Sequence, residues 1–128
     1  MILLRHLMNI LLSELEVQDE LLGLLIRERV AIVKRSQDEM DAVLVDRELL
    51  EQKLEALILR RENMFRALEN EMHLGSNRLS LDNLSAVDDG ELQLLGESLS
   101  TAFDTIYEMR QQNKTMRQQT IGVVHEPH

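Results

Sequence analysis

The amino-acid sequence predicts an all-α fold: a long antiparallel helical hairpin followed by a third long helix, packed as a bundle with coiled-coil-like seams. Of the 128 residues 44% are hydrophobic and strong helix formers are common, while only 5 glycines and 1 proline interrupt them. Apolar residues recur at three- and four-residue steps along three long segments. Capping signals at residues 36–39 and 88–91 begin two of these segments. A chain of this length is expected to form one domain, residues 1–128.

The first helix is expected at about residues 2–34. Its apolar stripe consists of Leu4, Leu7, Leu11, Leu15, Leu22, Leu25 and Ile32. Further apolar residues widen this stripe, namely Leu12, Leu21, Leu24 and Ile26. A stripe of this width predicts that the helix packs against two neighbouring helices rather than one.

The second helix is expected at about residues 36–73. Ser36 and Glu39 can form a capping box, in which the Glu39 amide donates to the Ser36 hydroxyl and the Ser36 amide donates to the Glu39 side chain. The stripe of this helix alternates steps of three and four, which favours left-handed coiled-coil packing. It consists of Met40, Val43, Arg47, Leu50, Leu54, Leu57, Arg61, Met64 and Leu68. A short connection between two long stripes predicts an antiparallel hairpin.

Two arginines, Arg47 and Arg61, interrupt the apolar stripe of the second helix. We expect each arginine to lay its aliphatic stem on the core and to pair with a carboxylate of the first helix, such as Glu14, Glu16 or Glu20. The alternative is that these arginines set the register of the bundle or contact a polar partner.

A connector is expected at about residues 74–88, lying over the hairpin and containing one short helical turn. Gly75 can adopt the left-handed conformation that ends the second helix. Asp88 can cap the third helix, which is expected at about residues 89–119, before a tail at 120–128. The third stripe consists of Leu92, Leu95, Leu99, Ala102, Ile106, Met109, Asn113 and Met116.

Charge and composition exclude several classes of function. The net charge is −9, so nucleic acid is not an expected partner. The one basic cluster lies at a helix carboxyl end, where cations suit the helix dipole; it consists of Arg27, Arg29, Lys34 and Arg35. No apolar run approaches the roughly 20 residues that span a bilayer, and the amino terminus lacks the pattern of a signal peptide. We therefore expect a soluble cytoplasmic protein with no membrane insertion.

No motif for catalysis or cofactor binding is present in the sequence. It has no cysteine, no glycine-rich phosphate loop, no nucleophile elbow and none of the Glu-x-x-His pairs of di-metal bundles. His125, Glu126 and His128 could bind a metal ion, but as part of a tail they are expected to be solvated. We expect a protein that is not an enzyme and that uses no cofactor and no metal.

The late part of the third helix is the candidate site for a protein partner. The candidate residues are Ile106, Met109, Asn113 and Met116, which continue the seam while the surrounding sequence becomes polar. A thin stripe that carries methionines can adapt to a partner helix. Because the stretch after Tyr107 has little apolar area, we expect it to be mobile when free and ordered when a client helix adds a second apolar face. The alternative is a helix end that frays.

Three segments resemble the FlgN family of flagellar export chaperones. Residues 15–29 resemble the first helix of the family, with a Leu-Leu pair followed by Glu28 and Arg29. Residues 46–65 match its pattern of charged residues before Leu-Leu, followed further along by an arginine. The third segment is a long last helix with a late asparagine, here Asn113. The resemblance covers most of residues 10–117, and the late segment departs from it by carrying glutamines where the family often has a second asparagine and apolar residues.

The resemblance implies a cytoplasmic, substrate-specific chaperone of the flagellar type III export system, with hook-filament junction proteins as clients. It leaves open a contact with the export apparatus and a homo-oligomer. A client whose terminal amphipathic segments are disordered before assembly exposes apolar faces, which a helical stripe can cover. Two alternatives remain: a structural coiled-coil interaction protein whose stripes close on themselves, and another type III secretion chaperone.

Overall fold

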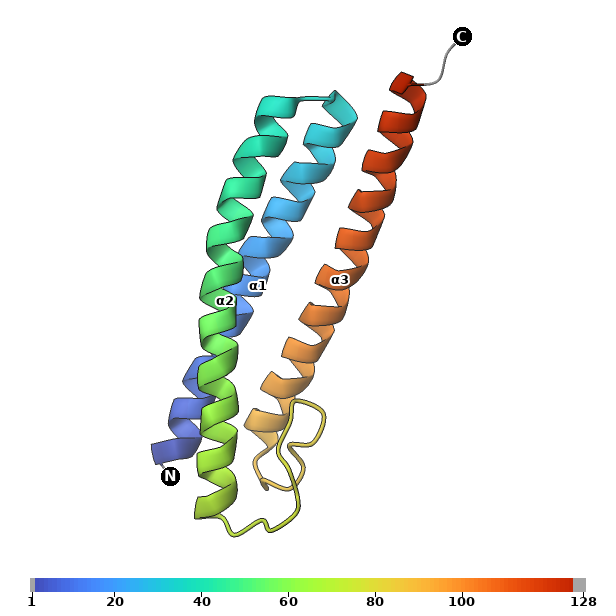
Figure 1. Cartoon of the computed structure of the whole chain (residues 1–128). Helices are drawn as coiled ribbons and strands as arrows, with labels where there is room; N and C mark the ends of the chain where they lie inside the picture. The colour runs from blue at the N-terminus through green and yellow to red at the C-terminus, as the bar shows by residue number, and fades with distance from the viewer. Residues whose placement is uncertain (1, 126–128) are drawn as a thin grey trace.

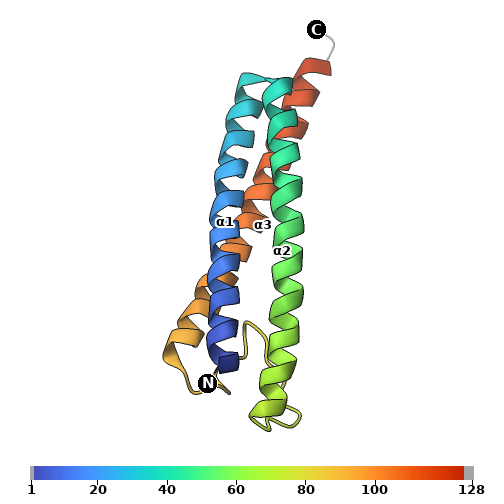
Figure 2. The ribbon, with the colours of Figure 1, turned by 90° about the vertical axis from the view of Figure 1, so that its left-hand side faces the viewer.

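The computed structural model describes residues 2–125, with side chains described for residues 2–119. It contains three helices, α1 (Ile2–Lys34), α2 (Gln37–Glu71) and α3 (Gly90–His125), and no strand in the described part of the chain (Figure 1). The all-α prediction is therefore confirmed. α1 and α2 run antiparallel, and α3 runs in the same direction as α1 (Figures 1 and 2).

α1 is the central helix of the bundle. Both α2 and α3 pack against it, whereas the described backbones of α2 and α3 do not pack against each other. This arrangement confirms the prediction that the wide stripe of α1 contacts two neighbours. The described parts of α2 and α3 therefore contact each other only through their side chains.

The buried apolar residues form two clusters along the bundle. The basal cluster consists of Leu7, Leu11, Phe65, Leu68, Leu79, Leu84, Val87, Leu92 and Leu99. The central cluster consists of Val17, Leu21, Leu25, Leu54, Leu57 and Ile106. Phe103 of α3 packs against both clusters and joins them. All three helices contribute to each cluster, as the three sequence stripes predict.

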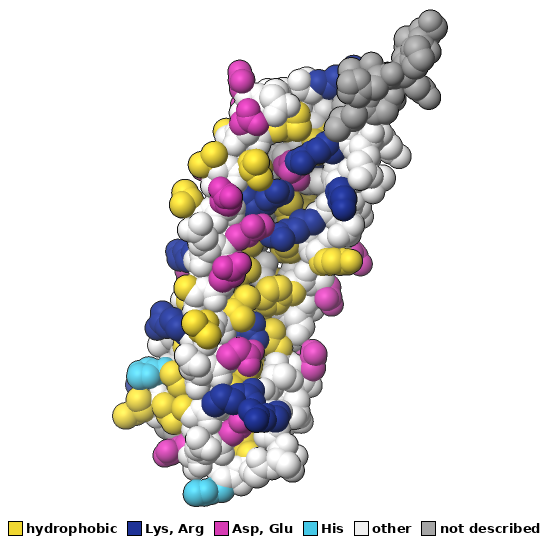
Figure 3. Space-filling view, viewed as in Figure 1, with side chains coloured by type: hydrophobic (Ala, Val, Ile, Leu, Met, Phe, Trp, Pro, Cys, Tyr) yellow, Lys and Arg dark blue, Asp and Glu magenta, His cyan; other side chains and the backbone are white. Residues whose placement is uncertain are grey.

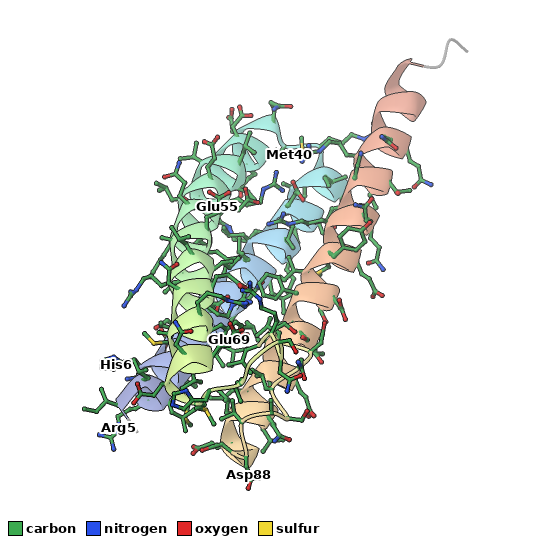
Figure 4. The ribbon with its side chains drawn as sticks, turned by 60° about the horizontal axis from the view of Figure 1, so that its bottom comes forward. Arg5, His6, Met40, Glu55, Glu69 and Asp88 are labelled. Atoms are coloured by element: carbon green, nitrogen blue, oxygen red, sulfur yellow. The ribbon has the colours of Figure 1, made fainter. Side chains whose placement is uncertain are left out.

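The connector at residues 72–89 contributes three buried residues to the basal cluster, namely Leu79, Leu84 and Val87. It contains isolated turns and no helix, so the expected helical turn is wrong. Its backbone is held to α2, because the Leu79 amide donates to Glu69 at 2.6 Å and Arg66 donates to the Leu79 carbonyl at 2.8 Å. Glu69 lies where α2 meets the connector (Figure 4). The connector also lies close to α3, since a Cβ on Gly96 would collide with the Leu84 side chain.

The junction between α1 and α2 combines two caps. Arg35 has a positive φ of 54°, and the amides of Arg35 and Ser36 donate back to carbonyls in the last turn of α1. The Glu39 amide donates to the Ser36 hydroxyl at 3.3 Å, which confirms the first half of the capping box. The reciprocal bond is not made, because the Ser36 amide is already bonded to the Ala31 carbonyl at 3.0 Å.

Three predicted helix ends need correction. α2 ends at Glu71, and His73, with a φ of 53°, is the left-handed residue that follows this helix end. Gly75 is left-handed as predicted, with a φ of 64°, but it lies two residues further along and does not end the helix. α3 is capped by Asp89 rather than Asp88, since the Leu92 amide donates to the Asp89 carboxylate at 2.9 Å. Figure 4 shows Asp88 at the turn that leads into α3.

α3 also extends further than predicted. Its backbone continues to His125 rather than ending near residue 119, so residues 120–125 of the predicted tail are helical. A single Gly122 lowers helix stability by only about 1 kcal/mol, and no proline occurs before Pro127. Residues 126–128 lie outside the described residues, as do the side chains of the expected His125, Glu126 and His128 tail group.

Replacing His73 by glycine should stabilise the protein. A left-handed conformation strains a residue with a Cβ, and glycine relieves this strain, so His73→Gly should raise the free energy of unfolding by about 1 kcal/mol. Urea denaturation followed by circular dichroism measures the change. His73→Ala is the matched control, because it removes the imidazole but keeps the Cβ. A glycine variant no more stable than the alanine variant would show that the cap is not strained.

Candidate partner-binding site

The four candidate residues of α3 lie on one face of the helix, as their spacing predicts. Ile106 is buried in the central cluster, and Met109 packs against that cluster. Asn113 is 1% exposed, and Met116 is partly buried. The structure therefore brings the four residues together, but on the face that α3 presents to α1. They form a covered seam rather than an exposed surface.

Asn113 is the best-satisfied polar residue of this seam. Its amide nitrogen donates to the carbonyl of Leu25 at 2.8 Å and to the Glu28 carboxylate at 2.9 Å. Its side-chain oxygen accepts from Arg29 at 3.0 Å, and the same guanidinium donates to Gln112 at 2.8 Å. Both amide hydrogens and the oxygen of Asn113 are thus used, which explains how an asparagine tolerates full burial.

Glu28 of α1 is the meeting point of all three helices. Its carboxylate accepts from Arg47 of α2 at 3.2 Å and from Arg117 of α3 at 2.5 Å, in addition to Asn113. We name the surrounding group the upper polar layer; it consists of Glu28, Arg29, Arg47, Glu51, Arg110, Asn113 and Arg117. Figure 3 shows basic and acidic side chains gathered between α2 and α3 at this level, with hydrophobic side chains below them. The layer also links α2 directly to α3, through Arg110 and Glu51 at 2.6 Å.

A second buried charge pair lies between the two apolar clusters. Arg61 of α2 donates to Glu14 of α1 at 2.9 Å and to Glu62 at 3.3 Å, and its guanidinium lies 5.9 Å from the ring centre of Phe65. Burial raises the pKa of the Glu14 carboxyl above its ordinary value, although the guanidinium of Arg61 acts in the opposite direction. We name Glu14, Gln18, Arg61 and Glu62 the lower polar layer.

The two layers contain buried polar atoms that have no hydrogen-bond partner among the described residues. They are one carboxylate oxygen of Glu14, both side-chain polar atoms of Gln18, and Nε of Arg110. Unpaired buried groups of this kind are rare and destabilise the packing around them. The interior of the bundle is therefore polar and incompletely hydrogen-bonded at both layers.

The two seam arginines have the predicted kind of partner. Arg61 pairs with Glu14, which confirms that prediction, but Arg47 pairs with Glu28 rather than with Glu14, Glu16 or Glu20. The reason is the hairpin register. Glu14 and Glu28 are two heptads apart, as are Arg47 and Arg61, so one antiparallel alignment pairs both sets.

Three polar residues belong to the buried seam of α1 and are absent from its predicted apolar stripe. The buried seam of α1 alternates steps of four and three and consists of Leu7, Leu11, Glu14, Gln18, Leu21, Leu25, Glu28 and Ile32. A search restricted to apolar residues leaves out its three polar members. Counting every residue at alternating steps would have revealed the seam and placed Glu28 inside the bundle.

Comparisons with known proteins gave no match, whether with protein-family models, with curated proteins or with solved structures. The likeness to the FlgN family is thus carried by the sequence features described above. In the described part of the chain, no cluster of three or more His, Asp or Glu side chains is placed to hold a metal ion. None of the helices, over the residues described, has the length and apolar content needed to cross a membrane.

Removing one member of the lower ion pair should destabilise the protein more than removing both. Arg61→Leu leaves the buried Glu14 carboxylate unpaired and should lower the free energy of unfolding by about 3–5 kcal/mol. Adding Glu14→Leu should restore most of this loss, because leucines can pack where the pair stood. Chemical denaturation of the two single variants and the double variant measures the coupling.

An exposed ion pair of the same hairpin supplies the control for this cycle. Arg27 and Asp46 lie 3.4 Å apart with about half of each side chain exposed, so Arg27→Leu should change the stability by less than about 1 kcal/mol. Strictly additive losses for Arg61→Leu and Glu14→Leu would contradict the assignment of a coupled buried pair.

Proposed function

We propose that this protein is a non-catalytic chaperone that holds an amphipathic helical segment of a client protein. The observation that carries the proposal is the unequal attachment of α3 to α1. The early part of α3 buries Leu92 and Leu99 completely in the basal cluster. The late part is attached through the polar upper layer instead.

The late part of α3 can leave α1 at low energetic cost. The ion pair between Arg110 and Glu51 is partly exposed on both sides, 38% and 36%, and pairs at such exposure contribute little to stability. Arg117 is 45% exposed, although its partner Glu28 is buried and keeps Arg47 as a second partner when Arg117 leaves. Among the described side chains after Ile106, the apolar residues of the seam are Met109 and Met116. Local opening follows the weakest contacts, so α3 should release from its carboxyl-terminal half while the basal cluster stays closed.

Release of this segment creates the surface that a client helix needs. The late α3 seam then presents Met109, Asn113 and Met116, and α1 presents the side that α3 covered. Methionines adapt to differing partner shapes, and an amphipathic client helix places its apolar residues along such a stripe.

The resemblance to the FlgN family supports a particular class of client. It favours hook-filament junction proteins, held in the cytoplasm before flagellar type III export, with no cofactor, metal or nucleic acid involved. Another type III secretion chaperone would use the same seam with a different client. A structural coiled-coil protein would keep α3 closed on α1 and would bind none of these clients.

Charging the late seam should abolish client binding while the protein stays folded. Met109→Asp with Met116→Asp places two carboxylates on the α3 face that the client covers, whereas the basal cluster is unchanged. We expect an unchanged helical circular dichroism spectrum and at least about a tenfold loss of affinity for a purified hook-filament junction protein, the equivalent of one buried apolar contact. Isothermal titration calorimetry measures the affinity.

The control variant adds the same charges to the solvent face of α3. Gln111→Asp with Gln118→Asp lies on exposed positions of the same segment and should bind the client like the unmodified protein. Hydrogen exchange gives an independent readout, since amides of residues 107–119 should exchange faster than those near Leu99 and become protected by the client. Full binding by the folded methionine double variant would move the site away from α3.

A further inference from the structure

A second stripe runs along the outer face of α2, away from α1. It consists of Ala42, Val45, Leu49, Gln52, Ala56, Leu59 and Asn63. Its residues alternate steps of three and four for three heptads, none of them is charged, and all are exposed. Val45, Leu49 and Leu59 are 60%, 62% and 63% exposed, although each is large and apolar. The bundle itself therefore leaves a coiled-coil seam without a partner.

Charged residues border this outer stripe with opposite signs on its two sides. The edge toward α3 is acidic and consists of Asp41, Glu48, Glu55 and Glu62. The other edge carries Lys53 and Arg60, after Asp46. Figure 3 shows acidic side chains on the side of α2 that faces α3 and basic side chains along its opposite edge.

The four charges nearest the middle of the stripe are uncommitted within the chain. Among the described residues, Glu48, Lys53, Glu55 and Arg60 take part in no ion pair and no side-chain hydrogen bond. The outer flanks differ, because Asp46 pairs with Arg27 and Glu62 pairs with Arg61 and Arg66. The middle of α2 thus presents charges that are ready to pair with another molecule.

We propose that a second copy of this chain docks on the outer stripe, so that two α2 helices form a parallel coiled coil. The stripe has two core positions in each heptad. Glu48 and Glu55 each come directly before a residue at the first core position, and Lys53 and Arg60 each come directly after a residue at the second. Parallel alignment brings Glu48 of one copy to Lys53 of the other, and Glu55 to Arg60. Symmetry makes each contact twice.

The charge pattern selects this orientation. An antiparallel pair of α2 helices would bring the acidic edge of one copy against the acidic edge of the other. Asn63 at a core position also suits a parallel two-stranded seam, where a polar core residue fixes register. Only three large apolar residues per copy enter the interface, so the dimer should be reversible. It does not use the seam between α1 and α3, so its test is independent of client binding.

Sedimentation equilibrium tests the dimer directly. From roughly 10 μM to roughly 1 mM chain, a range that captures micromolar and millimolar dissociation constants, the mass should rise from monomer to dimer and stop there. Leu49→Asp with Leu59→Asp should abolish the rise without loss of helical signal. The control is Leu94→Asp, because Leu94 is 65% exposed but lies on α3. A protein that stays monomeric throughout, or a control that abolishes the dimer equally, overturns the proposal.

Charge exchange tests the pairing, and a single introduced thiol tests the orientation. Glu48→Lys with Glu55→Lys, and separately Lys53→Glu with Arg60→Glu, should each weaken self-association at least about tenfold, while an equimolar mixture of the two variants restores it. The chain contains no cysteine, so Leu59→Cys places one thiol on the stripe. Mild oxidation should link two copies of this variant through their introduced thiols only if the helices run parallel. Failure of the mixture to associate, or no disulfide-linked dimer, overturns the parallel coiled coil.

Discussion

The alignment of the hairpin rests on two buried ion pairs that share one register. Arg61 meets Glu14 and Arg47 meets Glu28, and the equal spacing of the two sets means that a slip of one heptad would break both at once. A buried charge without its partner is strongly destabilising, so the alternative registers are penalised even where the leucines could still interdigitate. The leucines supply the buried apolar area, and the ion pairs determine the register in which they pack.

Glu28 extends this constraint from the hairpin to the third helix. Its carboxylate holds Arg47 and also Asn113 and Arg117, so the position of α3 along α1 depends on a residue that the hairpin has already fixed. The basal cluster anchors the other end of α3 with leucines and a connector that closes the base of the bundle. The molecule therefore has one apolar, firmly closed end and one polar end whose contacts are easier to exchange.

Much of the fold could be predicted from the sequence because stripes and caps are local properties. The bounds of α1, the start of α2 and the two neighbours of α1 followed from residue spacing and from the cap at Ser36. The left-handed cap at His73 could not be predicted from the sequence. The chain turns there so that the backbone of Leu79 forms hydrogen bonds with Glu69 and Arg66, and these contacts outweigh the local preference for glycine. The seam position of Asn113 was predictable, but its partners Leu25 and Glu28 depend on long-range packing that spacing does not encode.

The order in which the elements leave the ribosome matters for this topology. α1 and α2 follow each other closely in the chain, so the hairpin can form early, since nearby contacts close fastest. The contacts of Arg29 and Arg117 across the α1–α3 seam, in contrast, join residues more than eighty positions apart. Until the 36 residues of α3 have been synthesised, one whole side of α1 faces water with its leucines uncovered. The nascent chain is therefore prone to aggregation until α3 has been synthesised.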